Sequence, residues 1–309
     1  MSAQNPTSTQ AMTPASPPVA PATGGWQRGG AQAIRRRITD RAVGVACIVA
    51  TVVVVYLLFS ILWTLIVRGG AGLSLPTFTH STAAPGTGGG LANAIIGSLE
   101  QTGLAALIGT PLGMMAGVYL SEFSCDGRIV SLVRFVSDMM LSVPSILVGL
   151  FVYLIFVEPA GHFSGWAGMF ALTILFIPVV VRTTEDMLRL VPRAMREAAY
   201  ALGAPSWRVI LSVCLRAARG GIMTGVLLAL ARISGETAPL LFTSLGNLNW
   251  STSLNAPMAS LPVTIYQYAG SAYDDWVQMA WTGALLITAA VLATSILARW
   301  WLLRNGSVK

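Results

Sequence analysis

Long apolar stretches recur along the 309-residue chain, and short polar segments separate them. A helix that crosses the hydrocarbon core of a bilayer needs roughly 20 predominantly apolar residues. Six stretches approach or exceed this length, and the fourth is the shortest. The predicted spans cover residues 43–67, 91–120, 135–157, 166–181, 220–243 and 277–298. The expected fold class is therefore an all-α integral membrane protein with six transmembrane helices.

The first 40 residues differ from the rest of the chain. Most of this segment is rich in Pro, Ala, Ser, Thr, Gln and Gly and shows no periodicity. Such a composition buries too little apolar surface to offset the entropy of ordering. We therefore expect a disordered cytoplasmic tail over residues 1–40 and a transmembrane domain over residues 41–309. The core of that domain covers residues 91–300, and a long hydrophilic loop occupies residues 182–219.

The charge of the chain indicates its orientation. Only 10% of the residues are charged, against about 25% in soluble domains, and the net charge is +7. When six spans alternate from a cytoplasmic N-terminus, seventeen of the nineteen basic residues fall on the cytoplasmic side. This matches the positive-inside rule. We expect a multi-pass protein of the cytoplasmic (inner) membrane with both termini in the cytoplasm, and the basic excess does not indicate nucleic-acid binding.

The chain lacks the residues that several classes of enzyme require. The sole lysine is Lys309, so the chain cannot form a P-loop, which requires a lysine within a glycine-rich turn. The two histidines, His80 and His162, lie in separate predicted loops without clustered cysteines or carboxylates. We therefore expect no metal site and no cofactor bound by this chain. A membrane enzyme or sensor is the alternative, but no Ser-His-Asp set supports it.

The hydrophilic loop has the pattern of two short helices joined by a turn. A short helix through Glu197, Ala198 and Ala199 is expected to stop at Gly203, and a second helix is expected to start with Ser206 as its cap. Two short helices at a fixed angle would form a rigid knob at the membrane surface. The alternative is an arginine-rich amphipathic helix that lies on anionic lipid.

The fifth span contains two charged residues, Arg232 and Glu236, with Ser234 and Thr237 beside them. An intramembrane charge costs roughly 2.5–3.5 kcal/mol on insertion scales, so it normally faces a cavity or a partner. The spacing of four places both charges on one helical face. A guanidinium matches a tetrahedral oxyanion, so we expect these four residues to line a substrate pathway. The alternative is an ion pair that only fastens two subunits together.

The hydrophilic loop also resembles a known motif. Glu197-Ala198-Ala199 followed by Gly203 is similar to the EAA motif of the membrane subunits of bacterial ATP-binding-cassette importers. This resemblance implies the type I importer permease fold and a coupling helix that seats in a cleft of a separate ATPase. The chain departs from the family's Leu-Pro-Ala-Ala-Leu-Pro-Gly stretch, because residues 215–221 lack both prolines.

The fifth span resembles one branch of that family. Residues 231–243, Ala-Arg-Ile-Ser-Gly-Glu-Thr-Ala-Pro-Leu-Leu-Phe-Thr, look like the signature of PstA-type permeases of the phosphate-specific transport system. The sister PstC type typically has Gly-Glu-Thr-Met-Ala at the corresponding place. Further similar segments are residues 117–123, 142–151, 178–185 and 261–266.

The resemblance implies an ATP-driven phosphate importer with several partners. These are a PstC-type sister permease subunit, a dimer of ATPase subunits that holds ATP and magnesium, an external phosphate-binding protein and membrane lipid. This chain would be the permease subunit and not an enzyme. The alternatives are a permease for another oxyanion, such as molybdate or sulfate, and the sister phosphate permease subunit.

Overall fold

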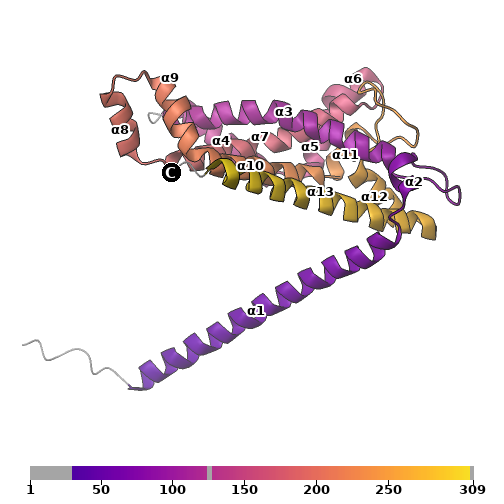
Figure 1. Ribbon diagram of the computed structural model, residues 1–309, viewed down its shortest axis with the longest axis horizontal. Coiled ribbons are helices and arrows are strands. Elements are labelled where there is room, and N and C mark those ends of the chain that lie inside the picture. Colours follow the sequence, from indigo (N-terminus) through magenta and orange to yellow (C-terminus); the bar gives the residue numbers. More distant parts are fainter. Residues whose placement is uncertain (1–29, 124–126, 307–309) are drawn as a thin grey trace, which may run out of the picture. The chain divides into compact units, whose positions relative to one another are not determined.

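The computed structural model describes residues 30–123 and 127–306, and every regular element in these ranges is a helix. The elements are α1 (Gly30–Ala71), α2 (Leu75–Thr79), α3 (Ala92–Glu122), α4 (Arg128–Ser142), α5 (Ser145–Val152), the π-helical η1 (Tyr153–Val157), α6 (Glu158–Ala160), α7 (Gly165–Arg189), α8 (Arg193–Ala201), α9 (Ser206–Val209), the π-helical η2 (Ile210–Cys214), α10 (Leu215–Ser234), α11 (Ala238–Thr243), α12 (Leu261–Ala269) and α13 (Asp274–Gly306) (Figure 1).

The chain separates into two units, residues 1–60 and 61–309. The described part of the first unit is the N-terminal portion of α1, whose side chains from Arg35 to Ser60 are exposed. The expected tail falls largely outside the described residues, and α1 itself begins at Gly30. The second unit contains the rest of the described helices.

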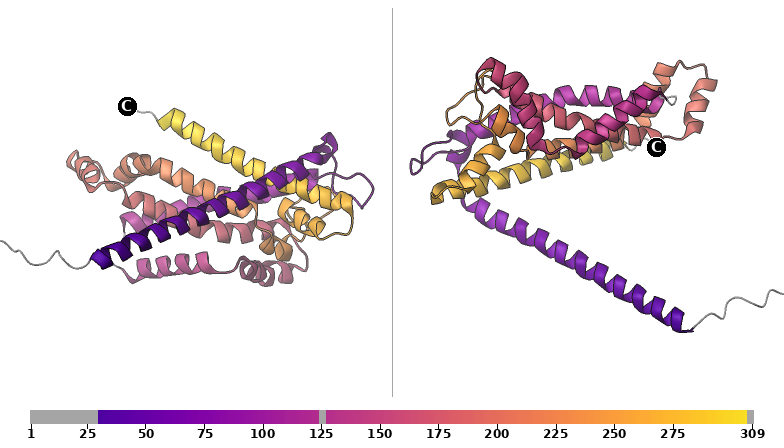
Figure 2. Two further views of the ribbon diagram at one scale, coloured as in Figure 1. Left: turned by 90° about the horizontal axis from the view of Figure 1, so that it is seen from below. Right: turned by 180° about the vertical axis from the view of Figure 1, so that it is seen from behind.

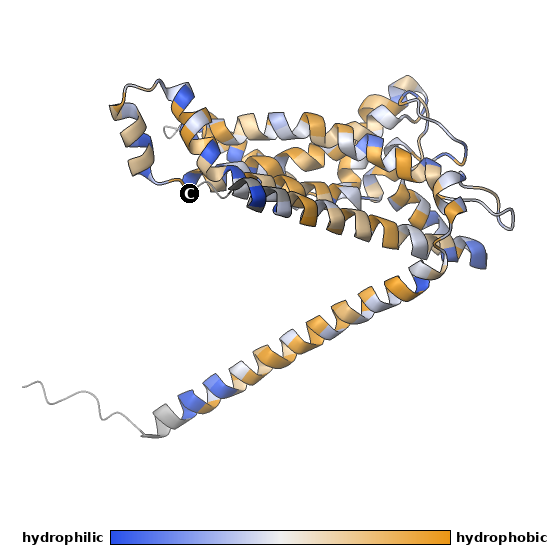
Figure 3. Cartoon of the chain, viewed as in Figure 1, coloured by the Kyte–Doolittle hydropathy of each residue, from blue (hydrophilic) through white to orange (hydrophobic). Residues whose placement is uncertain are grey.

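Five helices in the described ranges are long and apolar enough to span a membrane, and there are six when α4 and the segment after it are counted together as one bent span. The prediction of six spans is confirmed in this form. In the second unit the helices lie side by side, with α8 and α9 at one end and the loop before α3 at the other (Figures 1 and 2). Apolar residues are found along the whole length of the long helices, whereas α8 and α9 also contain hydrophilic residues (Figure 3).

Helix α7 forms the centre of the second unit. It packs against α3 through a row of glycines at intervals of four, Gly109, Gly113 and Gly117. A Cβ atom at Gly109 would lie 2.5 Å from a ring carbon of Phe176, and one at Gly117 would lie 2.7 Å from Cβ of Thr184. Small residues at this spacing let two backbones approach closely, which gives van der Waals contact in a bilayer that offers no hydrophobic drive between helices.

The fourth span is longer than predicted. The apolar stretch ends near residue 181, but α7 continues to Arg189 with Pro178 inside it. The helix extends because its charged last two turns are paired: Arg182 lies 3.2 Å from Asp186, and Arg189 lies 2.6 Å from Glu185. Hydropathy alone underestimated the helix because it does not register these pairs.

The third span is not one straight helix, as its prediction over residues 135–157 implied. Helix α4 ends at Ser142, and the chain bends by 105° before the next helical segment. Val143 precedes Pro144 and has an extended backbone. The proline ring disfavours the helical region for the residue before it, so the break falls at this dipeptide.

The fifth span begins and ends earlier than predicted. A continuous helical stretch runs from Ser206 through η2 and α10 to Ser234, where residues 220–243 were expected. Gly235 caps α10, and α11 starts afresh at Ala238. Pro239 has no amide hydrogen, so it is tolerated in the first turn of α11 but would interrupt the ladder of a continuing helix.

A buried carboxylate joins three elements at the α8–α9 end of the second unit. The Glu185 side chain in α7 is only 2% exposed. One of its oxygens, Oε1, lies 2.6 Å from Nε of Arg134 in α4 and 2.6 Å from Nη2 of Arg189. Arg134 also donates to the carbonyl of Leu120 at the end of α3, at 3.0 Å. A single carboxylate therefore fixes α4 and the last turn of α3 to α7.

We predict that Glu185→Gln lowers the free energy of unfolding by about 2 kcal/mol, because the buried side chain loses its charge-assisted hydrogen bonds to two partly exposed arginines. Denaturant titration of the purified chain in mixed micelles would measure the loss. Asp186→Asn is the matched control, since Asp186 and Arg182 are both exposed and such pairs contribute roughly 0–1 kcal/mol. Equal losses in the two variants would contradict the role assigned to Glu185.

Candidate functional site

The predicted pair of Arg232 and Glu236 is present at the junction between α10 and α11. Arg232 lies in the last turn of α10, and Glu236 follows the capping residue Gly235. The two residues therefore lie at the end of α10 and just beyond it, and not within one continuous helix. Nε of Arg232 lies 3.8 Å from Oε1 of Glu236, and the side chains are 48% and 17% exposed. At this distance the charges attract without a hydrogen bond, and about half of the Arg232 side chain is exposed in the single chain.

The two smaller predicted site residues occupy different surroundings. Ser234 donates a hydrogen bond from Oγ to the carbonyl of Leu230 at 2.7 Å. It lines a largely apolar groove of about 380 Å³ between α3, α10 and α13, with Leu99 and Ile287 among the other lining residues. Thr237 is the N-cap of α11 and carries no side-chain capping bond. The structure thus brings Arg232 and Glu236 together and places Ser234 on an apolar surface.

A feature that the sequence reasoning missed is the packing of two broken spans beside this pair. Helices α5 and α11 each follow a break in a span, and they meet where Gly149 lies against Pro239. A Cβ atom at Gly149 would be 2.6 Å from Cα of Pro239. Non-helical backbone at membrane depth is tolerated where it is buried in protein or lines a cavity. The prolines at residues 144 and 239 were the signal for it in the sequence.

The EAA loop forms the helix and turn that were expected up to Gly203. Helix α8 ends at Ala201, and Gly203 has φ +78°, a conformation that glycine adopts without strain. The turn is closed by hydrogen bonds from the amide of Gly203 to the carbonyl of Tyr200 (2.9 Å) and from Ala204 to Ala199 (3.2 Å). Glycine at this position therefore sets the angle between α8 and α9.

The predicted cap at Ser206 is wrong. Ser206 is the first residue of α9, and Pro205 is its N-cap, whose carbonyl accepts from the amides of Arg208 (2.9 Å) and Val209 (3.1 Å). Proline fixes the extended entry into the helix, so no serine side chain is needed there. The second helix is also not short, because it continues through η2 into α10.

The motif residues of α8 differ in exposure. Glu197 and Ala198 are exposed, whereas Ala199 packs against the buried cluster of Leu188, Val209 and Cys214. Large apolar side chains lie beyond them on the surface: Leu202 is 88% exposed, and Tyr200 and Trp207 are exposed as well. Exposed apolar groups gathered on a turn are typical of an interaction surface.

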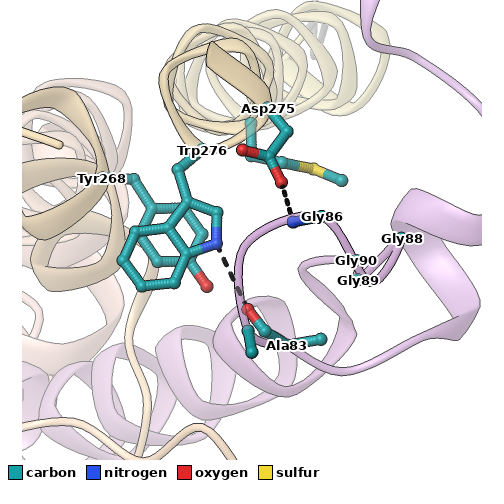
Figure 4. Close-up of a pocket in the computed structure, with 10 residues that line it drawn as sticks. Ala83, Gly86, Gly88, Gly89, Gly90, Tyr268, Asp275 and Trp276 are labelled. Carbon is teal, nitrogen blue, oxygen red and sulfur yellow. Dashed lines mark hydrogen bonds between the residues drawn. The ribbon is translucent and has the colours of Figure 1, made fainter. Parts of the chain in front are cut away.

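At the opposite end, the start of α13 holds a glycine-rich loop in place (Figure 4). Nε1 of Trp276 donates to the carbonyl of Ala83 at 3.2 Å, and Oδ2 of Asp275 accepts from the amide of Gly86 at 2.6 Å. The ring of Trp276 stacks on Tyr268 with centroids 4.4 Å apart. These groups line a pocket of about 200 Å³. Burial raises the pKa of the Tyr268 phenol.

A buried asparagine ties the same loop to the segment after α11. The side chain of Asn93 accepts from the amide of Thr82 at 3.0 Å and donates to the Thr82 hydroxyl at 2.8 Å and the carbonyl of Asn247 at 2.9 Å. Sequence reasoning missed this residue, because its partners Thr82 and Asn247 lie 11 and 154 residues away along the chain.

Comparison with known proteins adds independent information. Residues 109–304 match the family described as "Binding-protein-dependent transport system inner membrane component". Among solved structures, the chain is similar to the MetNI methionine ABC transporter in an inward-facing conformation, with a TM-score of 0.53 and 19% identity over 70% of this chain and 94% of that one. At this identity the likeness shows the fold alone, which is that of type I ABC importer permeases.

Similar sequences narrow the family further. The chain is 54% identical to "Phosphate transport system permease protein PstA" of Haemophilus influenzae, over 81% of this chain and 89% of the relative. It is 51% identical to the PstA protein of Xylella fastidiosa over 88% of this chain and 94% of the relative. It is 38% identical to the PstA 1 protein of Mycobacterium tuberculosis over 86% of this chain. The chain therefore belongs to the inner membrane components of binding-protein-dependent transport systems and, within them, to the PstA family of phosphate transport permeases.

Proposed function

We propose that this chain is a membrane subunit of an importer that carries inorganic phosphate across the cytoplasmic membrane, with Arg232 as a transient counter-charge for the anion. The observation that carries the proposal is the family membership together with an accessible arginine at the break of a span. A guanidinium offers several donors in a planar fork that fits a tetrahedral oxyanion. A loosely paired guanidinium can exchange its partner at little cost.

Glu236 limits how tightly Arg232 holds an anion. A transport pathway must bind its cargo strongly enough for entry and weakly enough for release. The carboxylate lies 3.8 Å from the guanidinium, so it can take over as counter-ion when phosphate leaves. Thr237, which follows Glu236, supplies a hydroxyl at the same chain break.

The energy for transport comes, in this proposal, from ATP hydrolysed by a partner. An ATPase dimer would receive α8 through Glu197, Ala198 and Ala199, with Gly203 setting the angle of the turn. A sister permease subunit would complete the membrane core, and an external phosphate-binding protein would deliver the cargo. Both termini would lie in the cytoplasm, as the distribution of arginines favours. The permease domain would extend from residue 41 to residue 309.

We predict that Arg232→Ala slows phosphate uptake about 100-fold, because charge-assisted hydrogen bonds worth roughly 3 kcal/mol are lost. Uptake into proteoliposomes that contain the whole importer would measure this, with sulfate and molybdate as competing anions. Arg232→Lys should give an intermediate rate, since it retains the charge but loses the fork. Arg216→Ala, at an exposed arginine of the same helix, is the control. Normal uptake by the Arg232→Ala importer would exclude the proposed role.

We predict that Gly203→Val releases the ATPase or abolishes its stimulation. A β-branched residue at φ +78° is strained, so the turn between α8 and α9 must rearrange. Co-purification of the ATPase and its stimulated hydrolysis are the two measurements. Gly220→Val is the matched control, since a Cβ atom at Gly220 meets no atom within 4 Å. A Gly203→Val complex with parental assembly and turnover would show that the turn is not needed.

We predict that the purified chain alone hydrolyses no ATP, because it has no internal lysine to form a P-loop. A phosphate-release assay in detergent, before and after addition of the ATPase, checks this. Robust turnover by the chain alone would contradict the division of labour between the subunits.

A further inference from the structure

One side chain of α8 points back into the bundle. Arg196 precedes Glu197 of the EAA motif, and its Nη2 atom lies 2.9 Å from Oε1 of Glu122, the last residue of α3. The same atom donates to the carbonyl of Leu188 near the end of α7, at 2.7 Å. One guanidinium thus contacts both α3 and α7.

This ion pair is shielded from solvent. The Glu122 side chain is 8% exposed and that of Arg196 is 21% exposed. Exposed pairs contribute little because water screens them and both side chains are free to move. A shielded pair with a further hydrogen bond is stronger and more rigid. It can therefore hold α8 at a fixed position relative to α3.

The rest of α8 offers little other attachment. None of its nine residues, all of which lie in the described ranges, is buried. Ala199 packs against the cluster of Leu188, Val209 and Cys214, but an alanine side chain contributes only a small contact. Met195, Glu197 and Tyr200 are exposed. Arg196 is therefore the side chain through which a displacement of α8 would reach α3 directly.

We propose that Arg196 and Glu122 are positioning residues that transmit movement from the EAA helix to α3 and its tightly packed partner α7. The inference rests on the proposed function, because it assumes that an ATPase engages α8. When the ATPase moves α8, the shielded pair carries the end of α3 along with it. The glycine row between α3 and α7 then passes the shift to the centre of the bundle.

The alternative role for this pair is purely structural, as a fastening that helps the chain to fold. The two roles differ in what a variant changes. A fastening affects how much importer assembles, but each assembled complex works normally. A transmission pair affects how much phosphate each assembled complex carries for each ATP that it hydrolyses.

The test uses the complete importer in proteoliposomes, with Arg196→Gln, Glu122→Gln, the double variant, and the charge exchange Arg196→Glu with Glu122→Arg. Phosphate uptake and ATP hydrolysis are measured on the same vesicles and normalised to the amount of ATPase that co-purifies. Arg216→Gln is the control, since Arg216 is exposed. We expect each single variant to lower the phosphate carried for each ATP about fivefold or more. The double variant should be no worse than either single one, and the exchange should restore part of the ratio.

Several outcomes would overturn the inference. The first is that both single variants carry as much phosphate for each ATP as the unsubstituted importer. The second is that the losses of the two single variants multiply in the double variant. The third is that the decrease disappears once uptake is normalised to the amount of assembled complex. A parental importer that carries no phosphate would instead show that the proposed function is wrong, and the transmission role would fall with it. A parental importer that works, combined with working single variants, would exclude the transmission role alone.

Discussion

The second unit is organised around the contact between α3 and α7, in which Gly109, Gly113 and Gly117 bring the two backbones together. Lipid tails are as apolar as leucine, so helices in a membrane associate through close packing and not through exclusion of water. Helices α4, α5, α10 and α11 then pack around α7. The positions of these four helices follow from this first contact, because α7 supplies the surface on which they rest.

The charged site depends on a second constraint, the need of the backbone for hydrogen bonds inside a bilayer. The helices are interrupted at residues 143–144 and 235–237, and irregular backbone at membrane depth occurs only where it is buried in protein or lines a cavity. Arg232 and Glu236 lie at one of these breaks. The end of a helix can accommodate charges that the middle of a continuous apolar helix would exclude.

Two carboxylates that are shielded from solvent connect the helices at the α8–α9 end of the second unit. Glu185 fixes α4 and the last turn of α3 to α7, and Glu122 connects the end of α3 to Arg196 in α8. Both involve the final turn of α3. The exposed Arg182 and Arg189 pair within α7 itself, with Asp186 and Glu185. Burial of the carboxylates distinguishes these two networks from the Arg182–Asp186 pair, whose side chains are nearly half exposed.

The sequence by itself determined the membrane class, the number of spans and the two motifs, because these follow from local patterns: apolar runs that match a bilayer, and the residue strings around Glu197 and Arg232. Prolines and glycines also marked the breaks, although their effect on helix ends was underestimated at Pro144 and Pro239. Only the tertiary structure decided which charges pair. Arg134 meets Glu185, and Arg196 meets Glu122, across separations that no helical periodicity links. The contacts of Asn93 and Asp275 with the glycine-rich loop likewise join chain segments that meet only after folding.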